Sequence, residues 1–176
     1  MIAFLATLPF YLALVVLHLA LVVLSFYVVN LAHEMGHVVG GQVVGLPIRK
    51  VFIGLPTEVK QTDRPSFSLL GIAFYFGYSS LYAFVKMDMA ALYRLPPKAR
   101  ITVFMAGPLS GTVVSIAWII ASFYCFVSIP QMVFQMLIGA LWVKLNLGNL
   151  RPDGGSDGGN DGYGIREAWH EIHGTP

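Results

Sequence analysis

Two long uncharged stretches constrain what this chain can fold into. Residues 1–32 contain no Asp, Glu, Lys or Arg, and residues 101–143 are free of all four as well. Each stretch is longer than the roughly 20 apolar residues that a helix needs to cross a bilayer. Charged residues make up only 11% of the chain, against about 25% in ordinary soluble domains, and the mean hydropathy is +0.70. The sequence therefore predicts an integral membrane protein.

The uncharged stretches predict three membrane helices. Pro9 suits the start of the first helix, and Gly40-Gly41 suits its end. The second stretch is interrupted at Ser128-Ile129-Pro130-Gln131, which indicates two spans joined by a tight turn. The expected spans are residues 10–39, 101–127 and 131–148. At 176 residues, the chain is expected to form a single domain over residues 1–176.

Residues 66–85 are also uncharged, but their composition favours strands over a fourth span. The stretch is rich in aromatic residues, Ser and Gly rather than in Leu and Ala. A full crossing would also move Arg94, Lys98 and Arg100 to the outer side of the membrane, against the positive-inside rule. With residues 51–59 as a preceding strand, we expect a membrane-associated strand segment over about residues 51–85. The predicted fold is an α-helical membrane protein with a three-helix core and this strand segment between the first two spans.

The basic residues set the expected orientation, because Lys and Arg gather on the cytoplasmic side of short loops. The loop between the first and second spans carries Arg49, Lys50, Lys60, Arg64, Lys86, Arg94, Lys98 and Arg100. The turn at 128–131 carries none. We therefore expect a multi-pass protein with its N-terminus outside and a cytosolic tail over residues 150–176. The scattered charges, with a net charge of +2, predict contact with lipid and no binding of nucleic acid.

One short motif carries the chemistry. His33-Glu34-Met35-Gly36-His37 is the pattern H-E-x-x-H, in which histidines four residues apart share one helix face. Both imidazoles can then reach one zinc ion at about 2.0–2.1 Å. Glu34 lies beside them, where it can take a proton from the catalytic water and deliver it to the leaving amine. An ionisable residue inside a membrane span costs about 2.5–3.5 kcal/mol and is usually functional, which argues against a chance occurrence.

A catalytic zinc needs a third protein ligand. His18 is excluded, because fifteen residues of helix place it about 22 Å from His33, and it is expected to pack between helices. His170 and His173 lack the required spacing and fall in the expected solvated tail. Cys125 stands alone inside an apolar run, so it predicts neither a disulfide nor a cysteine zinc site.

The segment from Asn149 to Gly158 fits the pattern N-x-x-P-x-x-x-x-D-G. Together with H-E-x-x-H in an earlier membrane helix, it resembles the signatures of the site-2 protease family of intramembrane zinc metalloproteases. Ala106-Gly107-Pro108 resembles that family's middle motif, and the resemblance covers nearly the whole chain. The chain is similar to a compact member without a PDZ domain. The family often has Asn where Gly111 stands here.

The resemblance implies that Asp157 supplies the third zinc ligand and that Asn149 positions or polarises the substrate near the metal. For Asn149, a helix C-cap is the alternative role. Asp153, Asp157 and Asp161 recur every four residues, each followed by Gly. Spacing from Asn149 and Pro152 selects Asp157, and Asp161 is the reserve. A calcium loop is a further alternative for this acidic stretch, although it lacks the EF-hand spacing.

The resemblance implies an enzyme, a zinc metalloendopeptidase with one zinc ion that hydrolyses peptide bonds in or next to transmembrane segments of membrane protein substrates. Such regulated intramembrane proteolysis requires the substrate helix to unwind locally, and pairing with the strand segment is a means of holding it. Two alternatives remain open. One is a non-proteolytic membrane protein that binds zinc, and the other is an inactive membrane adaptor. Only the enzyme needs a carboxylate at Glu34.

Overall fold

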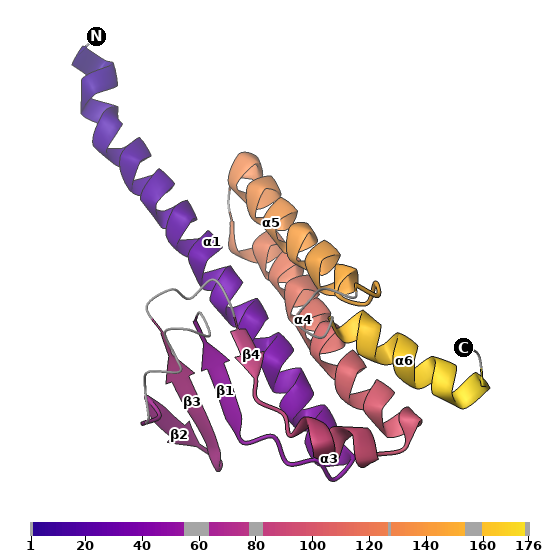
Figure 1. Cartoon of the computed structure of the whole chain (residues 1–176). Coiled ribbons are helices and arrows are strands. Elements are labelled where there is room, and N and C mark those ends of the chain that lie inside the picture. Colours follow the sequence, from indigo (N-terminus) through magenta and orange to yellow (C-terminus); the bar gives the residue numbers. More distant parts are fainter. Residues whose placement is uncertain (1, 55–63, 78–82, 127, 154–159, 175–176) are drawn as a thin grey trace.

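The structure, a computed structural model, describes residues 2–54, 64–77, 83–126, 128–153 and 160–174. Its described part is mostly helical, with a small sheet that lies along the first helix (Figure 1). The sheet is formed by the chain between the first helix and the remaining helices. This order agrees with the predicted strand segment between the first two spans.

Helix α1 (Ile2–Val43) contains the first uncharged stretch and continues through the H-E-x-x-H motif. Its N-terminal part extends beyond the rest of the molecule in Figure 1. Apolar side chains there face outward, with Phe10 64% and Leu12 62% exposed. A long helix that is apolar on all sides and bare of protein contacts is suited to lipid rather than to water.

Helices α4 (Pro97–Cys125) and α5 (Ile129–Gly148) lie side by side and meet at the predicted break. The Ser128 side chain accepts a hydrogen bond from the Gln131 backbone N–H at 3.4 Å and so caps the start of α5. Within the described residues, α1 and α4 are the two helices both long and apolar enough to cross a membrane. Helix α5 has twenty residues, about 30 Å of helix, but it carries the polar residues Gln131, Gln135, Lys144 and Asn146.

The predicted strand segment forms a four-stranded sheet rather than a fourth membrane crossing. Its strands are β1 (Lys50–Ile53), β2 (Phe67–Leu69), β3 (Ile72–Phe76) and β4 (Ala83–Val85), in the order β2-β3-β1-β4. β1 and β3 are parallel, and the other pairs are antiparallel. The strands β2 and β3 are joined by the two-residue loop Leu70-Gly71, with φ of 50° and 78°, as two-residue hairpin turns require.

The main buried cluster lies between the sheet, α1 and the start of α4. Val51 and Phe74 are paired neighbours on β1 and β3, and both are buried. They pack with Val38 of α1 and Val103 of α4 in one hydrophobic cluster. Leu92, from the short helix α3 (Met89–Arg94), completes it with an exposed fraction of 0%. This cluster fixes the sheet against the helix that carries the H-E-x-x-H motif.

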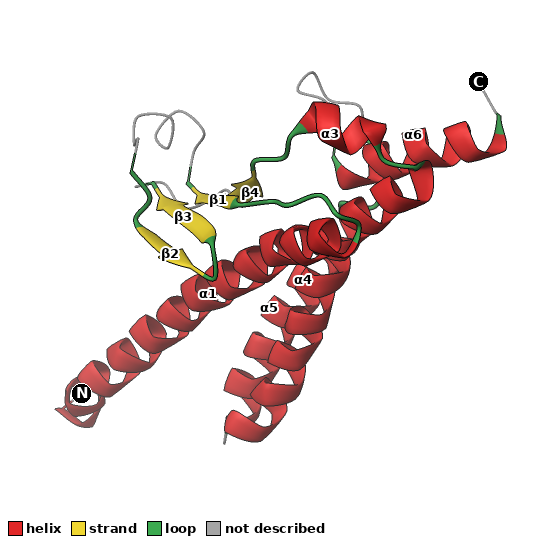
Figure 2. Cartoon of the chain, turned by 90° about the horizontal axis from the view of Figure 1, so that it is seen from below, coloured by secondary structure: helices red, strands yellow, loops and turns green. Residues whose placement is uncertain are grey.

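Helix α6 (Asp161–His173) forms in the segment that was expected to be a solvated tail. It lies against α4, as Figure 2 also shows. Asn160 caps its start by accepting a hydrogen bond from the Tyr163 N–H, and Gly174 ends it with a left-handed φ of 64°. The chain after α5 therefore returns to the helical bundle and brings Asp161 back to it.

Candidate metal centre

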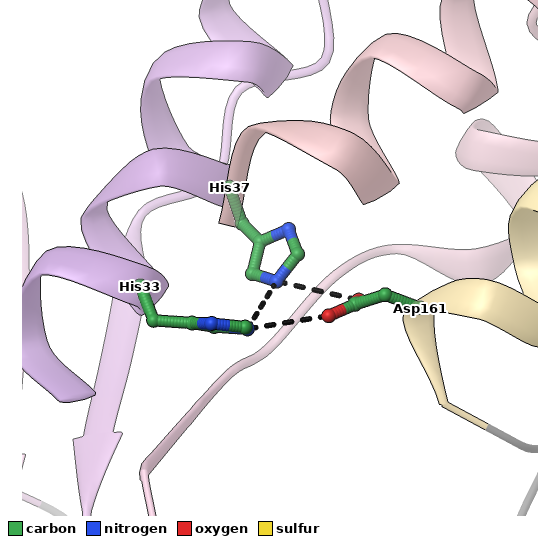
Figure 3. A group of neighbouring side chains, drawn as sticks. All are labelled: His33, His37 and Asp161. Carbon is green, nitrogen blue, oxygen red and sulfur yellow. Dashed lines mark hydrogen bonds and ion pairs between the residues drawn. The ribbon is translucent and has the colours of Figure 1, made fainter. Parts of the chain in front are cut away.

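His33 and His37 lie one turn apart on α1, and their rings point to the same place, as predicted from their spacing (Figure 3). The two Nε2 atoms are 3.2 Å apart. Both residues are buried, with exposed fractions of 8% and 3%. Two ring nitrogens are thus brought together in a site shielded from solvent.

The other ring nitrogen of each histidine is held by an acceptor. Nδ1 of His33 donates to Oδ1 of Asn146 at 2.8 Å, and Nδ1 of His37 donates to the backbone oxygen of Val103 at 2.8 Å. Because these acceptors place the proton on Nδ1, each neutral ring presents the lone pair of Nε2. Two lone pairs that face each other at this distance repel unless a cation lies between them.

Asp161 at the start of α6 completes a group of three possible ligands. Its Oδ2 lies 3.2 Å from Nε2 of His33, and its Oδ1 lies 3.4 Å from Nε2 of His37 (Figure 3). Tetrahedral coordination at zinc–nitrogen distances of about 2.0–2.1 Å separates neighbouring ligand atoms by about 3.3 Å. The distances in this trio agree with that value, and the two-imidazole, one-carboxylate donor set is one that zinc accepts. These residues could therefore hold a metal ion.

The carboxyl group of Asp161 is in the charged form that binds a cation. Burial by itself raises its pKa, but the adjacent imidazole groups of His33 and His37, through hydrogen bonding and charge together, lower it by more. The net result is a pKa below the ordinary value for Asp. A negative ligand is thus available at physiological pH.

Glu34 is buried beside the trio, with an exposed fraction of 7%. The backbone N–H of Val85, in the strand β4, lies close to its carboxyl group. The candidate base therefore lies between the metal centre and the edge of the sheet. Such a position allows it to act on a water molecule or a peptide held at either side.

Small residues of α4 leave the space that the centre needs. A Cβ atom added to Gly107 would lie 2.3 Å from Nε2 of His37, and one added to Gly111 would lie 2.0 Å from Oδ1 of Asn146. On the opposing helix, a Cβ on Gly36 would lie 2.2 Å from the backbone oxygen of Ala106. The Ala106-Gly107-Pro108 motif is therefore the point where α4 approaches α1 closely enough to enclose His37.

The structure brings His33, Glu34, His37 and Asp161 together, and it treats the other predicted site residues differently. Asp157, the ligand expected from spacing, lies outside the described residues. Asn149 is the exposed C-cap residue of α5, and its backbone oxygen accepts from the N–H of Gly162 at 2.8 Å. The alternative C-cap role of Asn149 is thus seen, and its substrate role stays a prediction.

His18 and Asn146 are two further polar residues within the helices α1 and α5. His18 was expected to pack between helices, and its ring lies 6.0 Å from that of Phe126 and 5.8 Å from that of Phe134. Asn146, which orients His33, was missed by the sequence reasoning. An amide inside the apolar stretch 131–148 was the available signal, because polar groups in a membrane helix are costly and usually functional.

Two comparisons with known proteins gave different results, and the family model agrees with this arrangement. None of the curated proteins compared with the chain matches it. A family model described as Peptidase family M50 matches residues 21–170, a range that contains the H-E-x-x-H motif, the Ala106-Gly107-Pro108 motif and Asp161. The chain therefore belongs to peptidase family M50, the site-2 protease family, and is a membrane protein of that family.

Proposed function

We propose that this protein is an intramembrane zinc metalloprotease that hydrolyses peptide bonds in or next to transmembrane segments of membrane protein substrates. The observation that carries the proposal is the convergence of His33, His37 and Asp161 beside the buried carboxyl group of Glu34. Membership of family M50 supports the same activity. The apolar surface of α1 supports its location within the membrane.

Each residue of the centre has a separate task in this proposal. His33, His37 and Asp161 hold one zinc ion, which supplies a Lewis acid for the scissile carbonyl. Glu34 takes a proton from the attacking water and later gives it to the leaving amine. Asn146 and the backbone of Val103 hold the two imidazoles in the tautomer that presents Nε2. Asp161 takes the ligand role that spacing had assigned to Asp157.

The membrane arrangement is part of the proposal. We infer that α1, α4 and α5 form a three-span core, with α5 as the third span because its polar residues Gln135 and Asn146 are buried among the helices. The concentration of Lys and Arg between α1 and α4 supports a cytoplasmic position for that segment. The N-terminus is then outside and α6 is on the cytoplasmic side.

The sheet offers a means of holding an extended substrate. The backbone N–H of Lys86 donates to the backbone oxygen of Lys50 in β1. In an antiparallel pair the backbone groups of every second residue point to the partner strand, so those of Ala83 and Val85 point away from β1. This outer edge of β4 lies next to Glu34. An unwound substrate segment that pairs with the edge would pass the metal centre with its carbonyl groups accessible.

The two alternatives, a non-proteolytic zinc protein and an inactive adaptor, are separated from the enzyme by Glu34. Neither alternative needs a carboxylate at position 34, because Glu34 lies beside the three candidate ligands but is not one of them. A Gln at this position keeps the size and hydrogen bonding of the side chain but cannot accept a proton.

The test is co-expression with tagged single-span membrane proteins, comparing the wild type with Glu34→Gln. We expect the wild type to produce cleaved fragments and the variant to produce none, while both purify with about one zinc per chain. Cleavage that persists in Glu34→Gln contradicts the assigned base. Zinc binding without cleavage of any tested protein by the wild type favours the non-proteolytic alternatives.

A further inference from the structure

One face of α6 carries both the carboxyl group at the metal centre and a second carboxyl group farther along. Asp161, Gly164, Ala168 and Glu171 follow the spacing i, i+3, i+7, i+10, which defines a single helix face. A Cβ atom on Gly164 would lie 2.5 Å from ring atoms of Phe104 in α4. Because this face rests directly on α4, any shift of α6 moves Asp161 and Glu171 together.

The fully buried residues of α6 are small. They are Gly162, Gly164 and Ala168, of which Gly162 lies against the backbone of Leu150 and Arg151 and Gly164 lies against Phe104 of α4. Hydrophobic stabilisation grows with the apolar area removed from water, so these residues permit close approach without fixing the helix strongly. Polar contacts of α6 with α4 and α3 can therefore add to what sets its position.

Arg100 of α4 provides the main polar contact. Its side chain is 5% exposed, and its guanidinium group forms an ion pair with Glu171 of α6. Arg100 lies in the first turns of α4, where the positive end of the helix dipole disfavours a cation. Within the described residues, its Nε has no hydrogen-bond partner. The carboxylate that α6 brings to this buried cation is itself 58% exposed, so the pair lies at the edge of the contact between the two helices.

Tyr93 of α3 makes a second polar contact with α6. Its hydroxyl donates a hydrogen bond to Oε2 of Glu167 at 3.0 Å. The guanidinium carbon of Arg100 lies 5.3 Å from the centre of the Tyr93 ring, within the range of a cation–π contact. Arg100 is thus held between the ring of α3 and the carboxylate of α6.

We propose that Arg100 and Glu171 are positioning residues for the metal centre, because their ion pair holds α6 where Asp161 reaches His33 and His37. This inference rests on the proposed function, since it takes Asp161 as a zinc ligand. Ten residues of helix separate Asp161 from Glu171, about 15 Å at 1.5 Å per residue. The pair therefore acts on the metal through the helix and not by contact.

The test uses the full chain purified in detergent, with two measurements. Zinc affinity is measured by competition with a chelator of known affinity, and the visible spectrum of the cobalt-substituted protein reports the number and geometry of the ligands. We expect Glu171→Gln to weaken zinc binding about tenfold, the lower end for residues that orient metal ligands, and to change the cobalt spectrum. Arg166→Gln is the matched control, because it removes an exposed charge whose ring contact, with Tyr163, lies within α6.

Charge reversal provides a rescue that a general loss of stability would not show. Arg100→Glu and Glu171→Arg should each weaken zinc binding more than Glu171→Gln does. The double variant should recover most of the affinity, because the reversed pair also suits the dipoles of both helices. If the single reversals fail to fold, Tyr93→Phe, which removes only the hydroxyl bound to Glu167, should still give a smaller loss of affinity.

Two results would contradict this inference and leave the proposed function unaffected. One is an unchanged zinc affinity and cobalt spectrum in folded Glu171→Gln, and the other is a double reversal that binds zinc no better than the single ones. A wild-type protein that binds no zinc is a different outcome. It overturns the proposed function, and this inference with it.

Discussion

The amide oxygen of Asn146 lies 2.8 Å from Nδ1 of His33, although the two residues are 113 positions apart in the chain. The amide nitrogen of Asn146 in turn donates to the backbone oxygen of Trp142 at 2.9 Å, which fixes which way the amide points. Asn146 therefore selects the tautomer of His33. Gly111 leaves the space for this amide, because a Cβ added there would lie 2.0 Å from Oδ1 of Asn146.

Replacement of Asn146 by Ala should weaken zinc binding by roughly 10- to 100-fold, as for other residues that orient a metal ligand. Asn146→Asp should lose much less, because a carboxylate also accepts from Nδ1. Asn149→Ala is the comparison, since Asn149 is exposed at the end of α5. It should leave zinc affinity unchanged and raise KM if Asn149 contacts substrate. Equal losses of zinc in Asn146→Ala and Asn149→Ala would contradict this assignment.

Asp161→Asn should lose most of its zinc, whereas Asp157→Asn should retain it. The physical reason is that Asp161 has both carboxyl oxygens within 3.4 Å of the histidine nitrogens. Metal content per chain after dialysis, measured by mass spectrometry, decides the question. The reverse result would restore Asp157, the ligand that the family spacing selects.

Gly107→Ala should prevent His37 from taking its present position, because the added Cβ would lie 2.3 Å from Nε2. Overpacking of this kind costs about 1–3 kcal/mol, and here it should also reduce zinc binding. Gly148→Ala is the control, since nothing lies within 4 Å of its added Cβ. Thermal unfolding and zinc content are measured on both. A Gly107→Ala protein with normal zinc content would show that α1 and α4 separate easily.

Removal of metal should lower the unfolding temperature of the wild type, because the two imidazoles and the carboxylate then lose the cation that joins them. A ligand at 1,000 times its Kd stabilises the folded state by about 4 kcal/mol. Unfolding is followed with and without a chelator and after zinc is added back. Asp161→Asn should show little response to either treatment. A wild type insensitive to chelation would argue against a metal that links α1 to α6.

Ala83→Pro should impair substrate cleavage without removing a bond of the sheet, since the N–H of Ala83 faces away from β1. Ser68→Pro is the matched change at the opposite edge, on β2. Cleavage of a tagged membrane protein and zinc content are compared between the two. Normal cleavage in folded Ala83→Pro would exclude pairing of the substrate with β4.

The features that sequence predicted well are those set by local spacing. His33 and His37 converge because a four-residue separation on a helix leaves little freedom. The strands were predictable because aromatic and Ser residues between 66 and 85 suit a pleated surface better than a membrane helix. The break before α5 followed from Ser128 and Pro130, which favour a helix start.

What sequence did not predict depends on contacts between distant segments. Helix α6 is amphipathic, but its buried residues are small, and its polar contacts are made with Arg100 of α4 and Tyr93 of α3, far away in the chain. The choice between Asp157 and Asp161 likewise depends on where α6 begins, which Asn160 fixes by bonding to Arg151 and Tyr163. Asn146 was missed because its partner lies on another helix.

The separation of the trio along the chain has a consequence for biosynthesis. His33 and Asp161 are 128 residues apart, and the segments between them must be made and inserted first. When the ribosome has completed α1, the sheet and α4, the chain contains His33, His37 and Glu34. Asp161, the third candidate ligand, has not yet been synthesised. The nascent chain therefore passes through the insertion machinery before the three candidate metal ligands can meet.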